Sequence, residues 1–255
     1  MRTPWRMALV VCLVVRAAWA GDDTVSVMAF NVLFQGANDV ESLAAIKAQA
    51  RDVLCLTELT PAFEATFTRE LGADWPHRHF VPKAGTWGVG LASKRPLKDV
   101  KEFRVAPSKM PALEVTVDVG GKGVRFVCLH LTPPGMTQAK DDSLVARMAK
   151  NAAVREKQAA TLVARYKATK GPVVLLGDFN EEAGGAALEA LEDAGWVRAC
   201  EGRPCSGSFP GPVSPWPALF LIDHVYARGV KVLAAETVRA GGSDHYPVTA
   251  TLQVK

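Results

Sequence analysis

Carboxylate, amide and imidazole side chains recur along this sequence at points where short apolar runs begin or end. The stretch "LLGDFNEE" (175–182) is the clearest case, because the apolar run 173–176 leads through a glycine into Asp178 and Asn180. The same arrangement is found at six further residues, namely Asn31, Glu58, His130, Asp223, Asp244 and His245. Any one of them alone has an ordinary explanation as a turn former or a solvated side chain. Active sites on rigid sheets are assembled where several strands stop, so the recurrence indicates a shared site.

The elements that must position these side chains are predicted from apolar periodicity. Short β-branched runs bounded by turn formers predict strands at 24–31, 53–57, 88–93, 113–119, 124–131, 173–176, 224–227 and 247–254. Apolar residues at helical spacing predict helices at 40–51, 144–166 and 186–194. Strands at hairpin spacing mixed with helical crossovers indicate a fold of the α/β (α+β) class, in which helices cover sheets.

The length and composition indicate one large globular domain. The chain has 255 residues, of which 49% are hydrophobic and 22% charged, enough for a sizeable core. No repeat, low-complexity run or linker divides the sequence. The stretch 204–217 contains five prolines and predicts a long irregular surface loop.

The first twenty residues are expected to be an export signal. Arg2 and Arg6 precede the apolar run 7–15, and the small residues Ala18 and Ala20 have the spacing that a signal peptidase recognises. The run is shorter than the ~20 apolar residues that span a bilayer. We therefore expect 1–20 to be a signal peptide cleaved before Gly21, a single folded domain over 21–255, and a periplasmic or secreted protein.

Removal of this signal would leave a nearly neutral protein. The full chain has 30 basic and 26 acidic residues, a net charge of +4, and three of its arginines lie in the signal, which leaves 27 basic residues against 26 acidic ones. Bulk electrostatics therefore does not require a long duplex nucleic acid as partner. The basic residues between 147 and 170 could form a local patch, although a solvated helix face is the more common explanation.

Four cysteines lie outside the expected signal. Cys200 and Cys205 bracket a short polar loop and predict a small disulfide of an oxidising compartment. Cys55 and Cys128 lie within apolar runs and are expected to behave as buried small hydrophobes. No pair of cysteines has the spacing of zinc ligands.

Six motifs together carry a family resemblance. In chain order they are "FNVL", "LTEL", "CLHL", "GDFNE", "IDHVYA" and "SDHYPV". Their order and approximate spacing resemble those of the endonuclease/exonuclease/phosphatase superfamily, the DNase I-like metal-dependent phosphoesterases, over about residues 24 to 254. The resemblance implies a four-layered α/β sandwich, with two mixed β-sheets packed face to face and helices outside.

The resemblance also assigns expected roles around a divalent cation. Glu58 is expected to be the principal carboxylate ligand of Mg²⁺ or Mn²⁺, with Asn31 and Asp244 beside the metal. Asp178 is expected to orient or deprotonate the attacking water. Asn180 is expected to hydrogen-bond a phosphate oxygen.

Two histidines are expected at the scissile phosphate. His245 should contact it, with Asp223 accepting the other ring N–H and so fixing the tautomer. His130 should be a second phosphate contact or a general acid. Members with His at this position often pair it with a Glu on a nearby strand, but "GTWGVGLAS" (85–93) contains no acid, so the sequence leaves the partner of His130 open.

The expected function is that of an exported metal-dependent phosphodiesterase, acting as a monomer without an obligate protein partner. A nuclease is the first choice. The alternatives are a phospholipid or sphingomyelin phosphodiesterase and a phosphomonoesterase acting on a small or lipid-like substrate; Phe209, Trp216 and Phe220 lie at the proline-rich stretch and could touch lipid. A non-catalytic binding protein of the same fold is less favoured, because the set of acids, amides and imidazoles is intact.

Overall fold

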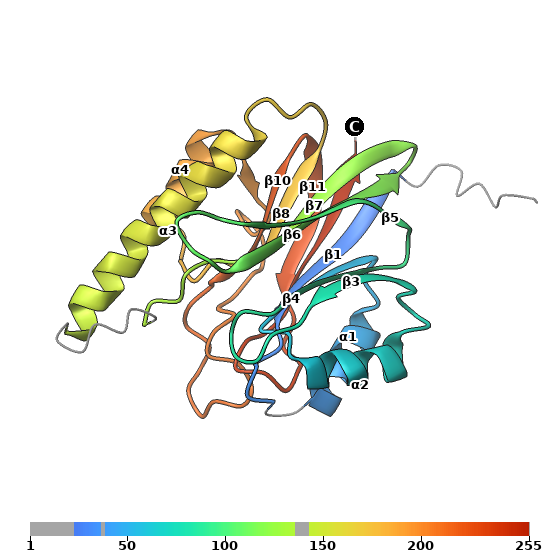
Figure 1. Cartoon of the computed structure of the whole chain (residues 1–255), viewed down its shortest axis with the longest axis horizontal. Coiled ribbons are helices and arrows are strands. Elements are labelled where there is room, and N and C mark those ends of the chain that lie inside the picture. Colours follow the sequence, from blue (N-terminus) through green and yellow to red (C-terminus); the bar gives the residue numbers. More distant parts are fainter. Residues whose placement is uncertain (1–22, 37–38, 136–142, 255) are drawn as a thin grey trace, which may run out of the picture.

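The computed structural model describes residues 23–36, 39–135 and 143–254 (Figure 1). The expected signal peptide, 1–20, lies outside the described residues. Within these ranges, no helix combines the length and the apolar character that crossing a membrane requires.

Two mixed six-stranded sheets form the centre of the molecule. The first has the order β11-β12-β1-β2-β4-β3, with strands β1 Thr24–Asn31, β2 Val53–Thr57, β3 His77–Val81, β4 Val89–Ser93, β11 Val230–Thr237 and β12 Val248–Val254. The second has the order β5-β6-β7-β8-β10-β9, with strands β5 Leu97–Arg104, β6 Pro111–Val119, β7 Lys122–His130, β8 Val173–Asp178, β9 Val197–Arg198 and β10 Asp223–Arg228. Each sheet has one parallel pair at its centre, β1–β2 and β7–β8, and antiparallel neighbours on both sides.

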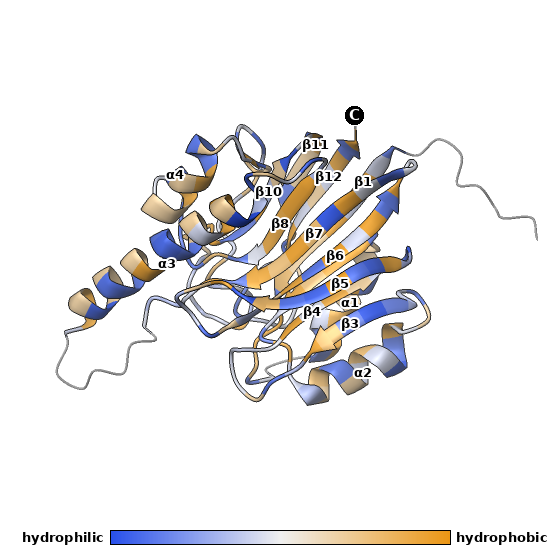
Figure 2. Cartoon of the chain, turned by 45° about the horizontal axis from the view of Figure 1, so that its top comes forward, coloured by the Kyte–Doolittle hydropathy of each residue, from blue (hydrophilic) through white to orange (hydrophobic). Residues whose placement is uncertain are grey.

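Helices cover the outer face of each sheet and complete four layers (Figure 1). Helices α1 (Asp39–Gln49) and α2 (Pro61–Leu71) bury apolar side chains against the first sheet, and α3 (Leu144–Tyr166) and α4 (Ala186–Asp193) do so against the second. A third apolar cluster fills the space between the sheets. Figure 2 shows the result, with the central strands largely hydrophobic and the helices hydrophilic on part of their surface. The predicted sandwich is confirmed.

A disulfide crosses the space between the sheets and corrects one prediction. Cys55 on β2 is bonded to Cys128 on β7, so these residues are not merely small buried hydrophobes. Each residue lies in a fully buried run, which explains why an apolar setting was predicted. The predicted bond between Cys200 and Cys205 is confirmed.

The four strands that the sequence did not predict are the four edge strands, β3, β5, β9 and β11. Edge strands need charged or short segments to avoid pairing with other chains, and such segments carry little apolar signal. Strand β5, with the sequence LKDVKEFR, is mostly exposed, and β9 has only two residues. Helix α2 was also missed, although Thr60 caps it and Pro61 begins it, which is a recognisable start signal.

The bond between the sheets should contribute more to stability than the bond within the loop. It joins residues 73 apart, whereas the other joins residues 5 apart. By loop-closure entropy, losing them should cost about 4 and about 2 kcal/mol of unfolding free energy. Urea denaturation of the Cys55→Ala/Cys128→Ala and Cys200→Ala/Cys205→Ala double variants measures both. A smaller loss for the first pair than for the second would contradict this account.

Candidate active site

The ends of both parallel strand pairs carry residues of the predicted site. Asn31 ends β1 and is paired with Thr57, the last residue of β2, so that Glu58 follows directly beside it. In the second sheet His130, at the end of β7, is paired with Asp178, at the end of β8. Because the two strands of a parallel pair stop at the same end of the sheet, this topology alone brings two polar side chains together in each sheet.

The antiparallel neighbours bring Asp223, Asp244 and His245 to the same ends of the two sheets. Strand β10 begins at Asp223, which is paired with Asp178 of β8. In the first sheet β12 runs antiparallel to β1, so Asp244 and His245, which precede β12, lie near the end of β1. The hydroxyl of Ser243 fixes this approach by donating to the carbonyl of Asn31 at 2.6 Å.

Asp178 lies at the centre of the cluster. Its Oδ2 accepts a hydrogen bond from Asn31 Nδ2 at 3.0 Å and lies 3.4 Å from His130 Nε2 and 3.9 Å from His245 Nε2. Its Oδ1 accepts from the backbone N–H of Asn180 at 2.8 Å. The side chain is 2% exposed, so nearly all its polar neighbours are protein groups.

The glycine of "LLGDFN" allows β8 to reach this position. Gly177 has a φ of +138°, and a Cβ there would lie 2.0 Å from the carbonyl oxygen of Leu129 on β7. Two residues of the predicted site also have positive φ, Glu58 at +57° and Asn180 at +53°. Such a backbone conformation is unfavourable for a side-chain-bearing residue and occurs often at functional sites.

His245 and Asp223 form a buried ion pair. His245 Nδ1 lies 2.7 Å from Asp223 Oδ2. Burial alone would lower the pKa of His245, but the carboxylates of Asp223 and Asp178 outweigh it and raise the pKa to about 10. The imidazole is therefore protonated at neutral pH, with Nδ1–H donating to Asp223 and Nε2–H available on the side of Asp178.

His130 has the opposite electrostatic character. Burial lowers its pKa, against the opposing effect of the nearby Glu58 carboxylate, so the ring is neutral. Its Nδ1 donates to the carbonyl of Thr86 at 3.1 Å, because a carbonyl can only accept. Thr86 in the loop before β4 is thus the partner that the sequence left open. The remaining nitrogen, Nε2, is an acceptor facing Asp178.

Asp178 itself is tuned toward proton transfer. Burial, reinforced by the negative charge of Asp223, raises the pKa of Asp178 to about 7. A general base is most effective when its pKa lies near the working pH. With a neutral His130 on one side and a protonated His245 on the other, Asp178 is placed to receive a proton.

The predicted metal ligands offer a set of oxygen atoms. Glu58 is 9% exposed and its Oε2 accepts from the backbone N–H of Phe34 at 3.1 Å. The amide oxygen of Asn31 accepts from Leu33 N–H at 3.0 Å, and a carbonyl oxygen has a second lone pair. Asp244 is half-buried and 3.4 Å from the Ser243 hydroxyl. Carboxylate and amide oxygens fit Mg²⁺ or Mn²⁺.

A second group of side chains also has the proximity of metal ligands. Ligand atoms of Asp178, Asp223 and His245 lie within 4.8 Å of one another. His245 Nδ1 already lies 2.7 Å from Asp223 Oδ2, at hydrogen-bond distance. We therefore interpret Asp223 and His245 as an ion pair, and Glu58, Asn31 and Asp244 remain the expected ligands of a cation.

The proline-rich stretch supports the site, a role that the sequence did not reveal. It is irregular, as predicted, but Ser208 within it is fully buried and its hydroxyl accepts from the backbone N–H of Asp223 at 3.1 Å. The Phe209 ring packs on His245 with centroids 5.0 Å apart. The backbone N–H of Gly211 donates to the carbonyl of Asp244 at 2.5 Å. This segment is therefore more than a surface loop.

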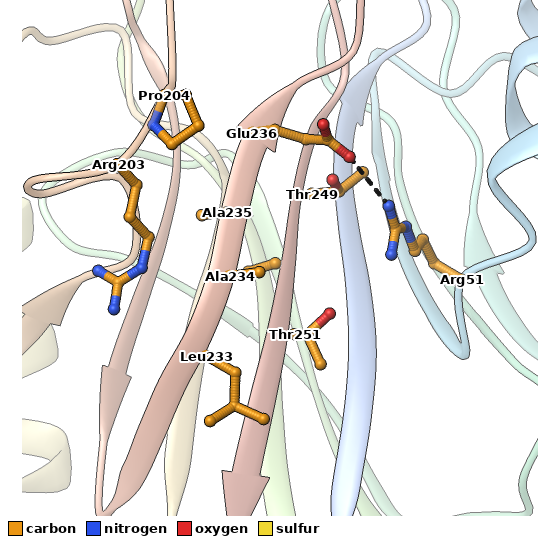
Figure 3. Close-up of a pocket in the computed structure, with 10 residues that line it drawn as sticks. Arg51, Arg203, Pro204, Leu233, Ala234, Ala235, Glu236, Thr249 and Thr251 are labelled. Carbon is orange, nitrogen blue, oxygen red and sulfur yellow. Dashed lines mark hydrogen bonds and ion pairs between the residues drawn. The ribbon is translucent and has the colours of Figure 1, made fainter.

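Two hollows in the surface differ in their relation to this cluster. A groove of about 800 Å³ includes Asn180 and His245 among its lining residues and opens beside the site. A separate pocket of about 340 Å³ lies over β11 and β12, where Arg51 and Glu236 form an ion pair at 3.2 Å (Figure 3). That pocket contains none of the predicted site residues.

Comparison with known proteins identifies the family. The profile described as "Endonuclease/Exonuclease/phosphatase family" matches residues 28–245. Two UPF0294 proteins of Vibrio vulnificus, from strains YJ016 and CMCP6, are each 31% identical to this chain over 96 residues. The match covers 36% of this chain and 31% of each relative, so the chain matches about a third of their length.

Solved structures share the fold over nearly the whole chain. The endonuclease/exonuclease/phosphatase from Bacteroides vulgatus has a TM-score of 0.69 at 19% identity, covering 91% of this chain and 99% of that one. D. rerio TDP2, solved in complex with a single-strand DNA product, has a TM-score of 0.68 at 15% identity, covering 91% and 100%. A functionally unknown conserved protein from Enterococcus faecalis V583 has a TM-score of 0.69 at 17% identity, covering 90% and 100%.

The ion pair between Asp223 and His245 predicts non-additive substitutions. If Asp223 acts only through His245, its removal has no further effect once the imidazole is gone. We expect His245→Ala and Asp223→Asn each to lower kcat/KM by ~10² to 10⁴-fold, and the double variant to be little worse than His245→Ala. The measurements are kcat/KM for all four proteins on a chromogenic phosphodiester, with a melting curve for each as the folding control. If the two losses multiply in the double variant, Asp223 does not act only through His245.

Proposed function

The chain belongs to the endonuclease/exonuclease/phosphatase family, and from this premise we propose that it is a divalent-metal-dependent phosphodiesterase. The observation that carries the proposal is the buried cluster around Asp178, which joins a neutral His130, a protonated His245 and the amide of Asn31. Members of the family are hydrolytic phosphoesterases. A binding protein without catalysis would have no need for three neighbouring groups with opposed pKa shifts.

The cation would be held by the carboxylates of Glu58 and Asp244 and the amide oxygen of Asn31. When bound, it supplies positive charge that neutralises the phosphoryl oxygens. The cluster around Asp178 would serve the other needs of in-line hydrolysis, which are a base for the attacking water and hydrogen-bond donors for the phosphate.

Residues at the strand ends of both sheets provide those functions. Asp178 orients the water and takes its proton as the water oxygen bonds to phosphorus and the bond to the leaving oxygen breaks. The amide of Asn180 uses one N–H on the carbonyl of Leu131 at 3.0 Å, and the other binds a phosphate oxygen. His245 donates its Nε2–H to the phosphate, while Asp223 holds the imidazole in place. His130, whose Nε2 is an acceptor facing Asp178, is placed for proton transfer with Asp178 rather than for donating to the phosphate.

Two substrate classes have specific support. A nucleic acid is the first choice from the sequence, and the likeness to TDP2, which was solved with a single-strand DNA product, supports it. A lipid phosphodiester is the second candidate, because the groove of about 800 Å³ that adjoins His245 is mainly apolar. A small phosphate ester would also reach the cluster.

Export is a separate proposal. The sequence of 1–20 has the three regions of a signal peptide. Two disulfides in the folded domain support the proposal, because such bonds persist in oxidising compartments. We propose a periplasmic or secreted monomer that begins at Gly21.

Removing the charge of Glu58 should greatly slow hydrolysis without unfolding the protein. We expect Glu58→Gln to keep the shape of the side chain, bind the cation poorly and lose activity by about 10² to 10⁴-fold, with an unchanged melting curve in EDTA. The assay offers plasmid DNA, RNA, sphingomyelin and bis(4-nitrophenyl) phosphate with Mg²⁺, Mn²⁺ or EDTA. Glu236→Gln, in the pocket of Figure 3, is the matched control. Wild-type turnover in excess EDTA would exclude the metal-dependent mechanism.

The export proposal makes a separate prediction about the mature protein. Material collected from the periplasm or medium of a bacterial expression host should begin at Gly21, because cleavage follows Ala20. Intact-mass spectrometry before and after alkylation should also find no free thiol among Cys55, Cys128, Cys200 and Cys205. Detection of Met1 in the exported protein would refute the cleavage site.

A further inference from the structure

Apolar residues from two segments line the groove beside the site. One segment is the first turns of α3, with Val145, Met148 and Ala152, and the other is the segment before β10, with Phe209, Phe220 and Ile222. His245 and Asn180 also line it, so the groove is continuous with the phosphate-binding end of the site. A volume of about 800 Å³ and an apolar lining with a few polar groups are typical of small-molecule sites.

The apolar surface extends onto the rim of the groove. Seven of the twelve large apolar side chains that are exposed among the described residues lie in two segments, 144–148 and 213–220. Helix α3 extends past the sheets at its N-terminal end (Figures 1 and 2), and its first buried residue is Asn151. The overhanging turns therefore expose apolar side chains that the fold itself does not bury, and such a patch marks an interaction site.

The charges of the groove disfavour a nucleic-acid strand. A strand carries a negative charge on each nucleotide and is normally bound by a cationic groove. Among the described lining residues the one arginine, Arg155, is already hydrogen-bonded to Glu181 and to the carbonyl of Thr132, and Glu182 adds an exposed carboxylate. Apart from the phosphate-binding end at His245, the groove therefore suits an uncharged apolar group.

We propose that the groove binds an acyl chain of a membrane phospholipid whose phosphate lies at His245 and Asn180. This inference rests on the proposed phosphodiesterase function, because that function places the phosphate. The chain leaves the phosphate along Phe209 and Ile222 and packs between Met148 and Phe220. The exposed residues of 144–148 and 213–220 lie against the lipid surface from which the substrate is taken, as amphipathic helices do.

Calorimetric titration with n-alkyl phosphates, from ethyl to decyl and below their micellar concentrations, tests the groove directly in the presence of Mg²⁺. Each methylene that leaves water should lower Kd by up to about fourfold, until the groove is filled. Met148→Gln and Phe220→Gln place an amide among apolar groups and should reduce the ratio of the ethyl to the decyl Kd by about tenfold. Leu233→Gln is the matched control, because Leu233 is 43% exposed, like Phe220 at 44%, and lies in the pocket of Figure 3.

Three results would overturn the groove assignment. The first is a Kd that is equal for ethyl and decyl phosphate. The second is a chain-length dependence that both groove variants retain, since the chain would then bind elsewhere. The third is that Met148→Gln weakens the binding of a single-stranded oligonucleotide, while the Kd of the n-alkyl phosphates does not depend on chain length. The titration measures binding, and bis(4-nitrophenyl) phosphate has no alkyl chain, so failure of this inference and failure of the phosphodiesterase proposal are distinguishable.

Vesicles of phosphatidylcholine and phosphatidylglycerol test the membrane as the source of the chain. The wild-type protein should cosediment with them, and Val145→Asp should reduce the bound fraction severalfold by placing a charge in the apolar rim. Val40→Asp should bind like wild type, because Val40 is exposed to the same 76% but lies on α1, on the far side of the sandwich. No cosedimentation, or equal losses in both variants, would overturn the membrane assignment.

Discussion

The position of the Asp178 carboxylate is the constraint on which the site depends. It is almost completely buried, and burying a carboxylate is unfavourable unless polar partners replace water. Those partners come from both sheets: Asn31 and His245 from the first, His130 and Asn180 from the second. The polar cluster therefore forms only when the two sheets pack in one relative position. The bond between Cys55 and Cys128 joins the two sheets through β2, which is followed by Glu58, and β7, which ends at His130.

The opposite characters of the two histidines follow from their partners. His245 faces two carboxylates and stays protonated, whereas His130 faces a backbone carbonyl and is neutral because burial prevails. Between them Asp178 has an acceptor nitrogen on one side and a donor nitrogen on the other. Neither histidine could fill the other's role, because exchanging Asp223 for a carbonyl would remove the charge that keeps an imidazolium in a buried site.

The sequence predicted the parts of the molecule whose signal is local. Buried strands such as 24–31 and 53–57 were predicted with their observed bounds, because side chains on both faces of such a strand pack against a core and are mostly apolar. The polar strand ends and the family resemblance gave the site residues. Edge strands such as β5 were missed, because their charged faces protect the sheet and resemble a loop. The partner of His130 is a backbone carbonyl, which no residue type encodes. The pairing of Cys55 with Cys128 required the packing of one sheet on the other.

The groove could not be predicted for the same reason, since its walls come from segments about 60 residues apart in sequence that meet only in the fold. Its position beside the polar cluster has a chemical consequence. Binding energy from a part of the substrate that does not react can hold the phosphate in line with the attacking water, and an apolar chain in the groove would also keep bulk water out of the site. Electrostatic contacts of His245 and Asn180 with the phosphate would then act in a drier environment, where they are stronger. The overhanging turns of α3, whose large apolar side chains the fold leaves exposed, would thus serve the reaction rather than stability.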